Sequence, residues 1–334
     1  MSIKKLYCFM MLIVFCICGL FPHMSQAAPF KVLVVMSYNL EKYAWVREIK
    51  EGIDSVLASD CEMKYFYMDT KTDFEGGPRK AKEAFALYQE FQPDGVIAAD
   101  DNAQSMFVVP YLKDKVRTPV MFCGVNAESE TYGYPATNVS GILERLHINA
   151  SVAFAQWLVP SIKSVGFITE NSATGKALLK QIQNESDTYS AKLVASKLPK
   201  TLREAVEMTE ELKKKCDLLL LGSMAGIPGK DGVPFTEKEV TSAITKTFGK
   251  PVIGSTDKNV EYGALCAVLR TGQEQGATAA QMLLKAMRGT PVSELPVTRN
   301  HQGKRIINAT VMKRLNIRPR PDVLGGAELV KTEE

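Results

Sequence analysis

The sequence KVLVVMS, residues 31–37, has five consecutive apolar positions and ends in a serine. A strand with one face in water alternates apolar and polar residues, whereas a parallel strand covered by helices on both faces is apolar throughout. This stretch therefore predicts a buried parallel strand. Similar short runs alternate with longer stretches of helical periodicity, which is typical of βαβ units and an α/β fold.

The alternation occurs twice, and this predicts two lobes. In the first half we expect strands at 31–37, 62–69, 95–100 and 119–125, with helices near 42–58, 78–91 and 102–113. We expect residues 139–144 to leave this lobe. In the second half we expect strands at 164–169, 191–198, 217–222, 252–255 and 264–269, with helices near 147–158, 174–188, 201–214, 236–247 and 273–287.

The N-terminus has the three zones of a secretion signal. Lys4 and Lys5 precede an apolar run from Leu6 to Phe21, and small residues follow at 25–28. The run is shorter than the roughly 20 residues of a spanning helix. We therefore expect a signal peptide at 1–27, cleavage near Ala27, and a mature protein in the periplasm without a lipid anchor.

Composition narrows the classes of partner and cofactor. The formal net charge is +4, no dense basic block stands out, and so we do not expect nucleic acid as a partner. His147 and His301 have no ligand-like spacing, so we expect neither a metal nor another cofactor. Of the cysteines after the signal, we expect Cys123, Cys216 and Cys266 to be small buried side chains.

Motifs for catalysis are missing. No Gly-x-Gly-x-x-Gly follows the first strand, no Gly-Lys is followed by Ser or Thr, and no Gly-x-Ser-x-Gly occurs. The pair Asp100-Asp101 could serve acid-base chemistry, but neighbours on an extended segment point apart and Asp101 suits a helix N-cap. We therefore expect a protein that is not an enzyme.

Polar residues gather where the predicted strands end, and ligands of open α/β sheets bind beyond the carboxyl ends of strands. Glu170, Ser255 and Thr256 belong to these polar runs. The candidate ligand-binding residues are Ser37, Tyr38, Asp100, Asp101, Asn102, Gly124, Asn126, Asn171, Ser172, Ser223, Met224 and Asp257.

Four further segments carry a family resemblance: residues 119–125 (PVMFCGV), 138–142 (NVSGI), 251–265 (PVIGSTDKNVEYGAL) and 307–317 (INATVMKRLNI). With the first strand, they resemble the ABC-transporter substrate-binding proteins of the type I periplasmic fold, in the branch that includes tryptophan- and tyrosine-binding lipoproteins. The sequence departs from that family at Asp100-Asp101-Asn102, where small hydroxyl residues or alanine are usual.

The resemblance implies two Rossmann-like lobes joined by a three-crossing hinge, with ligand trapped as the lobes close. We expect the crossings near 140–143, 269–271 and 291–296. The lobes would then comprise residues 28–141 with 270–291, and 142–269 with 292–320, followed by a tail at 321–334.

The resemblance also implies a monomer that captures a small solute and delivers it to an ABC permease. We expect an amino acid or similar amine-bearing solute, with its ammonium on Asp257 and on Asp100 or Asp101. The helix opened by residues 171–175 could receive a carboxylate or simply carry an ordinary cap. The rival functions are a sensing partner of a membrane kinase or chemoreceptor, an enzyme, and an adhesion protein.

Two further side chains have open roles. We expect Trp45 to pack in the core, although it could join Tyr38 in an aromatic wall of the cleft. Arg145 could reach the cleft or pair with a neighbour, and we favour a structural role at the hinge.

Overall fold

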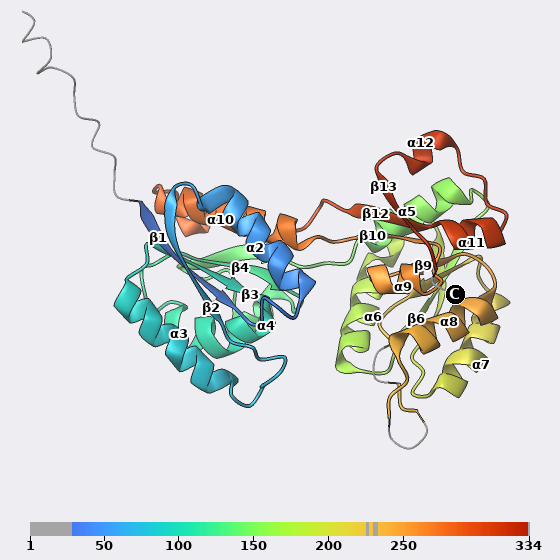
Figure 1. Ribbon diagram of the computed structural model, residues 1–334, viewed down its shortest axis with the longest axis horizontal. Helices are drawn as coiled ribbons and strands as arrows, with labels where there is room; N and C mark the ends of the chain where they lie inside the picture. Colours follow the sequence, from blue (N-terminus) through green and yellow to red (C-terminus); the bar gives the residue numbers. More distant parts are fainter. Residues whose placement is uncertain (1–28, 225–226, 230–232, 333–334) are drawn as a thin grey trace, which may run out of the picture.

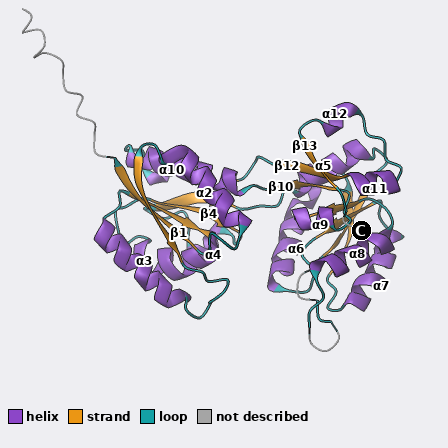
Figure 2. Cartoon of the chain, viewed as in Figure 1, coloured by secondary structure: helices purple, strands orange, loops and turns teal. Residues whose placement is uncertain are grey.

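The computed structural model describes residues 29–224, 227–229 and 233–332, arranged as two lobes side by side (Figure 1). The expected signal peptide lies outside these residues. Within them, no helix has both the length and the apolarity to cross a bilayer. In each lobe, helices flank a central sheet (Figure 2).

The first lobe is built on a parallel sheet in the order β11-β5-β4-β3-β1-β2. Its core strand β1 is fully buried from Val32 to Met36, which confirms the prediction from the apolar run. The strands are β1 (Phe30–Met36), β2 (Cys61–Tyr67), β3 (Gly95–Ala99), β4 (Val120–Val125), β5 (Val139–Leu143) and β11 (Thr298–Arg299). The helices are α2 (Ala44–Leu57), α3 (Gly77–Phe91), α4 (Asp100–Ala103), the π-helix η1 (Gln104–Leu112), the short η2 (Ser129–Tyr132), α10 (Gly272–Met287) and η5 (Val292–Glu294).

The second lobe has a sheet in the order β13-β12-β10-β9-β8-β6-β7, in which only the β10–β12 pair is antiparallel among the described strands. The strands are β6 (Ser164–Ile168), β7 (Lys192–Lys197), β8 (Leu218–Leu221), β9 (Val252–Gly254), β10 (Cys266–Leu269), β12 (Lys304–Asn308) and β13 (Ala327–Val330). The helices are α5 (Ile148–Leu158), α6 (Ala173–Glu185), η3 (Ser186–Thr188), α7 (Leu202–Lys213), α8 (Glu237–Phe248), α9 (Asp257–Glu261), α11 (Ala309–Arg314) and α12 (Pro321–Leu324).

Three stretches of the described chain cross between the lobes, at 144–147, 270–271 and 300–303. The second matches its expected place, but the first and third do not. Residues 140–143 are part of β5, which pairs with β4 inside the first lobe. Residues 291–296 also stay in the first lobe, because the chain continues into β11, which pairs with β5, and Leu295 is buried there.

The expected lobe boundaries change accordingly. The first lobe keeps residues 142–143 and 292–299, which we had assigned to the second. Residues 321–330 are not a separate tail, because β13 pairs with β12 along the edge of the second sheet. The sequence did not predict these boundaries because β11 has only two residues and β13 is a short edge strand, and neither produces a clear periodicity in the sequence.

The helices α2 and α10 pack backbone to backbone through glycines. A Cβ atom on Gly276 would lie 2.0 Å from the Ile49 carbonyl oxygen, and one on Gly52 would lie 2.2 Å from the Gln273 carbonyl oxygen. Gly272 likewise leaves no room for a Cβ atom beside Glu48. We call Gly52, Gly272 and Gly276 the glycine seam. It fixes α10, the helix that follows the second crossing, to the rest of the first lobe.

The topology turns the carboxyl ends of both sheets toward the hinge. Strand β5 runs directly into the first crossing, and β1, β3 and β4 run in the same direction. Strand β10 runs directly into the second crossing, and β6, β8 and β9 run in the same direction. The loops that follow these strands therefore border the space between the lobes.

Three of the four cysteines among the described residues are buried, as predicted: Cys123, Cys216 and Cys266. Together with the half-buried Cys61 they are all free thiols.

Candidate ligand-binding site

Asp100 is the most unusual residue at the strand ends. It directly follows β3, has a left-handed backbone with φ of 68°, and is only 3% exposed. Its Oδ1 accepts a hydrogen bond of 2.9 Å from Trp45 Nε1, while its Oδ2 is buried without a hydrogen-bond partner among the described residues. Burial raises the pKa of Asp100 well above its usual value, and the nearby Glu144 and Asp101 raise it further.

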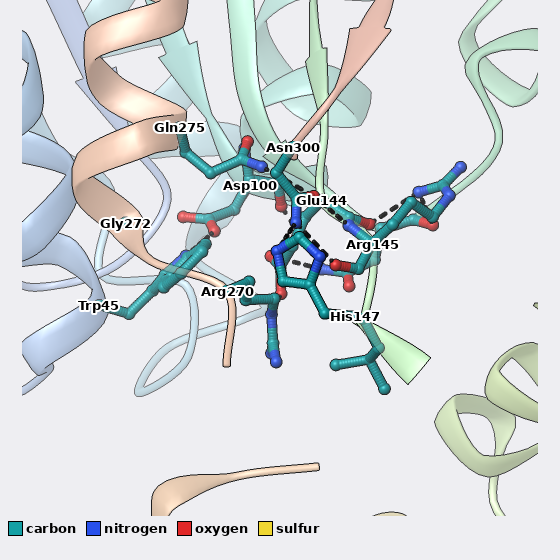
Figure 3. Close-up of polar contacts among 12 residues, drawn as sticks. Trp45, Asp100, Glu144, Arg145, His147, Arg270, Gly272, Gln275 and Asn300 are labelled. Carbon is teal, nitrogen blue, oxygen red and sulfur yellow. Dashed lines mark hydrogen bonds and ion pairs between the residues drawn. The ribbon is translucent and has the colours of Figure 1, made fainter. Parts of the chain in front are cut away.

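A chain of contacts joins Asp100 to the hinge (Figure 3). The Arg270 guanidinium lies over the Trp45 ring, 5.6 Å from its centroid, and forms an ion pair with Glu144. Glu144 is 4% exposed, and its other carboxylate oxygen accepts a hydrogen bond of 3.1 Å from Asn126 Nδ2. Because Glu144 lies on the first crossing and Arg270 on the second, this ion pair ties two crossings together.

Asn300 ties the third crossing to the first (Figure 3). Its Oδ1 accepts a hydrogen bond of 2.7 Å from the Arg145 backbone N–H, and its Nδ2 donates one of 3.0 Å to the Arg145 carbonyl. Asn300 Nδ2 also lies 2.8 Å from His147 Nε2. Gln275 adds a link between the lobe and this junction, since its amide contacts Gly124 N–H, the Leu143 carbonyl and Asn300.

Arg145 has the structural role that we favoured. Its guanidinium donates to the Asn126 carbonyl at 3.0 Å and to the Glu144 carbonyl at 2.8 Å, and it pairs with Glu128 at 2.8 Å. It is 9% exposed. Arg145 thus fastens the loop after β4 to the first crossing.

The other candidates of the first lobe support the loops around Asp100. Ser37 is fully buried and bonds to Ala99 and Ala103. Asn102 donates to Thr70 Oγ1 at 2.9 Å. Gly124 has φ of 67°, and a Cβ atom on it would lie only 2.8 Å from Asp100 Oδ1, so no side chain fits there.

Asp101 does not cap the helix as we expected, because α4 begins one residue earlier, at Asp100. Its carboxylate instead accepts hydrogen bonds from Asn126 N–H at 3.0 Å, Ala127 N–H at 3.2 Å and Tyr132 Oη at 2.8 Å. Every one of these donors belongs to the chain that follows β4. Asp101 therefore holds that loop in place.

Tyr38 lies among these carboxylates. Burial raises the pKa of its hydroxyl, and Asp100, Asp101 and Glu144 raise it further. Its ring meets Tyr43 edge to face at 6.1 Å, and Lys71 Nζ lies 5.5 Å from the ring centroid. Tyr38 and the half-buried Trp45 are therefore aromatic neighbours of the same acidic group, so Trp45 is not a plain core residue.

The candidates of the second lobe lie at the ends of β6, β8 and β9. Ser172 caps α6 by accepting a hydrogen bond of 3.0 Å from Gly175 N–H, and both Ser172 Oγ and Ser223 Oγ lie 3.2 Å from Glu170 Oε1. Asn171 is exposed, and Asp257 is an exposed residue in the first turn of α9. Met224 is fully buried, so a ligand contact at Met224 would need the loop to move.

A hollow of about 360 Å³ borders both lobes near the second crossing. Trp45 and Glu48 line it from the first lobe, Thr256 and Asp257 line it from the second, and Arg270 lies between them. Among the described residues, no group of three or more His, Cys, Asp or Glu side chains could hold a metal ion.

The comparison with known families decides the class of this protein. A family model described as ABC transporter substrate binding protein matches residues 96–331, which is more than half of the chain. The chain belongs to this family. The resemblance drawn from the strand segments is thereby confirmed.

Similar substrate-binding proteins add detail. The tyrosine-binding protein of Clostridioides difficile (strain R20291) is 25% identical over 186 residues, which cover 55% of this chain and 51% of that protein. The chain thus spans about half the length of this curated relative.

Two solved structures share the fold. One is the ligand-free, open form of a substrate binding protein with adhesive properties from Clostridium difficile, at 17% identity and a TM-score of 0.70. The other is an ABC domain in complex with L-Trp from Streptococcus pneumonia, at 18% identity and a TM-score of 0.61. Each match covers 91% of this chain and 100% of the other. At these identities they show the fold alone, two lobes of the type I periplasmic binding protein.

Sequence reasoning missed Glu144, Arg270, Gln275 and Asn300 as members of the site. Glu144 and Arg270 carried a signal, since each directly follows an apolar strand-like run. Gln275 and Asn300 carried none, because their roles depend on contacts between segments more than 100 residues apart in the chain.

Proposed function

We propose that this protein captures a small amine-bearing solute between its lobes, outside the cytoplasm, and delivers it to an ABC permease. The observation that carries the proposal is the unpartnered Oδ2 of Asp100. A buried carboxylate oxygen without a donor costs free energy, and a ligand ammonium would supply both the donor and the opposite charge.

The surroundings of Asp100 suit an amine with an apolar or aromatic body. Trp45 and Tyr38 offer ring faces beside the carboxylate, and aromatic rings attract cations as well as apolar groups. Two relatives named for tyrosine and L-Trp, which are aromatic amines, agree with this choice.

Capture would work through closure of the lobes. A ligand shifts an equilibrium between open and closed states only through contacts that differ between them. Asp100 belongs to the first lobe and Asp257 to the second, and only a closed cleft would let one solute contact both. The permease could then distinguish the loaded protein by its shape.

The test combines a thermal-shift screen with one variant. The screen uses L-tyrosine, L-tryptophan, tyramine and a set of aliphatic amines, and isothermal titration then measures the tightest binder on the wild type and on Asp100→Asn. Loss of a hydrogen bond to a charged group costs about 1.5–3 kcal/mol, so Kd should rise about 10- to 150-fold.

A matched control is Asp187→Asn, which neutralises an exposed carboxylate before β7, at the end of the sheet away from the hinge. Its affinity should equal that of the wild type. Equal affinity of Asp100→Asn and the wild type would remove Asp100 from the site, and a melting temperature that no solute in the screen raises would contradict solute capture.

A further inference from the structure

The two oxygens of the Asp100 carboxylate are not equivalent (Figure 3). Oδ1 accepts the hydrogen bond of 2.9 Å from Trp45 Nε1, whereas Oδ2 is buried and has no donor among the described residues. Gly124 also packs closely against Oδ1, because even a Cβ atom on this glycine would lie 2.8 Å from that oxygen. Only Oδ2 is therefore left for a ligand.

The backbone of Asp100 is fixed as well. Its φ of 68° lies in the left-handed region. The fully buried Gln104 donates from Nε2 to the Asp100 carbonyl at 3.2 Å and to the Ala98 carbonyl at 3.0 Å. With the backbone held, the Asp100 carboxylate can turn only about its side-chain bonds, and the hydrogen bond from Trp45 restricts that turning.

Trp45 is itself packed in place near the second crossing. It is the second residue of α2, and a Cβ atom on Gly272 of α10 would lie 2.9 Å from its carbonyl oxygen, so the two helices touch here. The Arg270 guanidinium, which is paired with Glu144, lies over the indole ring. The half-buried indole lines the hollow of about 360 Å³, whereas Asp100 does not line it. The indole therefore joins the hollow to the buried carboxylate.

Cations differ in how they bind a carboxylate. A guanidinium is a planar fork that donates two parallel N–H bonds, one to each oxygen, whereas a primary ammonium is a compact charge that a single oxygen can hold. At Asp100 the fork would find Oδ1 already bound by Trp45. Oδ2 has no contact with solvent, so the side chains around it must part to admit any ligand. The ammonium needs less room and competes with no existing hydrogen bond.

We infer that Trp45 makes this protein select a primary ammonium over a guanidinium, because its indole N–H keeps Asp100 Oδ1 occupied. The inference rests on the proposed function, in which Asp100 holds the cationic group of the solute, and it narrows the substrate class to solutes with a primary amine. Trp45 is a positioning residue, since it acts through Asp100. Burial raises the pKa of Asp100 and the hydrogen bond from Trp45 lowers it, so the indole also favours the charged carboxylate that a cation needs.

The experiment compares ligands that differ only in the cationic group. Isothermal titration would compare tyramine with 4-hydroxyphenethylguanidine, and 1-aminobutane with butylguanidine. At neutral pH both members of a pair carry one positive charge, because amines of this kind have a pKa of about 10 and guanidines one above about 12. In the wild type, the amine of whichever pair binds should bind at least about tenfold more tightly than its guanidine analogue.

A conservative variant assigns this selectivity to the indole N–H. Trp45→Phe keeps a ring beneath Arg270 but frees Asp100 Oδ1 for the guanidine, so the ratio of amine to guanidine affinity should fall below about three. Trp157→Phe is the matched control, because Trp157 is 55% exposed on α5 of the second lobe, and its ratio should equal that of the wild type. A merely structural role of Trp45 would weaken both ligands equally and leave the ratio unchanged.

The control variant also supplies a second measurement, which serves if Trp45→Phe fails to fold. The sequence has two tryptophans, Trp45 and Trp157, so Trp45 is the tryptophan that remains in Trp157→Phe. Its fluorescence would be excited at the red edge of the indole absorption, where neither amine absorbs. Saturating amine should shift the emission, because a positive charge would then lie beside the carboxylate that the indole binds.

The outcomes separate the inference from the proposed function. Equal affinity of the wild type for amine and guanidine, or an amine preference that persists in Trp45→Phe, would overturn the inference and leave the amine receptor standing. Trp45 emission that stays unchanged at saturating amine would overturn it too, although solute capture would stand. If no ligand of either pair bound, the inference would fall, and the thermal-shift screen would decide the proposed function separately.

Discussion

Replacing Asn300 by alanine should weaken the junction of the first and third crossings. The substitution removes both hydrogen bonds to the Arg145 backbone, at 2.7 and 3.0 Å, and the contacts with His147 and Gln275. Asn300 is 4% exposed and Arg145 is 9% exposed, so water replaces the lost partners poorly. A buried polar group left without a partner costs about 1–3 kcal/mol. The two backbone groups together predict a loss of about 2–6 kcal/mol in the free energy of unfolding.

Urea denaturation followed by circular dichroism would measure this loss in the ligand-free protein. His301→Ala is the matched control, because His301 is the next residue of the same crossing and is exposed, and its backbone N–H rather than its side chain bonds to Glu274. The control should change the free energy by less than about 0.5 kcal/mol. If Asn300→Ala also stayed within that range, the reasoning that Asn300 holds the crossings together would be wrong.

Two other perturbations test the glycine seam and the charge of Asp100. Gly276→Ala should lower the free energy of unfolding by about 1–3 kcal/mol or more, because the new methyl group would clash with the Ile49 carbonyl oxygen of α2. Gly325→Ala is the control, since the nearest atom to its new methyl group would be 3.4 Å away. Equal urea midpoints for the two variants would refute the close packing of α2 and α10. The pKa of Asp100 is raised in the folded protein above the value of about 3.9 in the unfolded chain, so its stability contribution is complete below about pH 4 and is lost as pH rises through the folded value. The side chain at position 100 in the Asp100→Asn variant stays neutral, so the melting temperature of the ligand-free variant should rise relative to that of the wild type from pH 4 to pH 8. The groups that face Asp100 are Trp45, Glu144, Asp101 and Lys71. A difference in melting temperature between variant and wild type that does not change with pH would contradict a buried charge at Asp100.

The strands and helices were predictable because their signal is local. The apolar runs at β1, β3 and β4 mark fully buried parallel strands, and the helices between them end within a few residues of the expected places. The crossings were less predictable. All five residues of strand β5 are buried like those of a core strand, but the sequence VSGIL is interrupted by Ser140 and Gly141. Its composition could therefore not show whether the chain stays in the lobe or leaves it after Ser140.

The rule that ligands bind beyond strand ends led to Asp100 and Asp257, which follow β3 and β9, and their part in ligand binding stays a prediction. It could not separate Asp100 from Asp101, because the difference arises from a left-handed backbone and from donors more than 20 residues away. The role of Trp45 could not be predicted either, because the hydrogen bond from its indole N–H to Asp100 does not affect the hydrophobic periodicity of the sequence.

The glycine seam has a consequence for how the lobes turn. It packs α10 against the first lobe from Gly272 onward, and β10 belongs to the sheet of the second lobe up to Leu269. In the second crossing, only Arg270 and Thr271 therefore lie between the two lobes. Consecutive Cα atoms are 3.8 Å apart, so this link cannot lengthen, and the axis of rotation must pass close to it. Points near that axis travel little and points far from it travel far. Trp45 and Arg270 should therefore keep almost the same separation from open to closed, whereas residues at the strand ends away from the crossings, such as Glu170, should move further toward the first lobe.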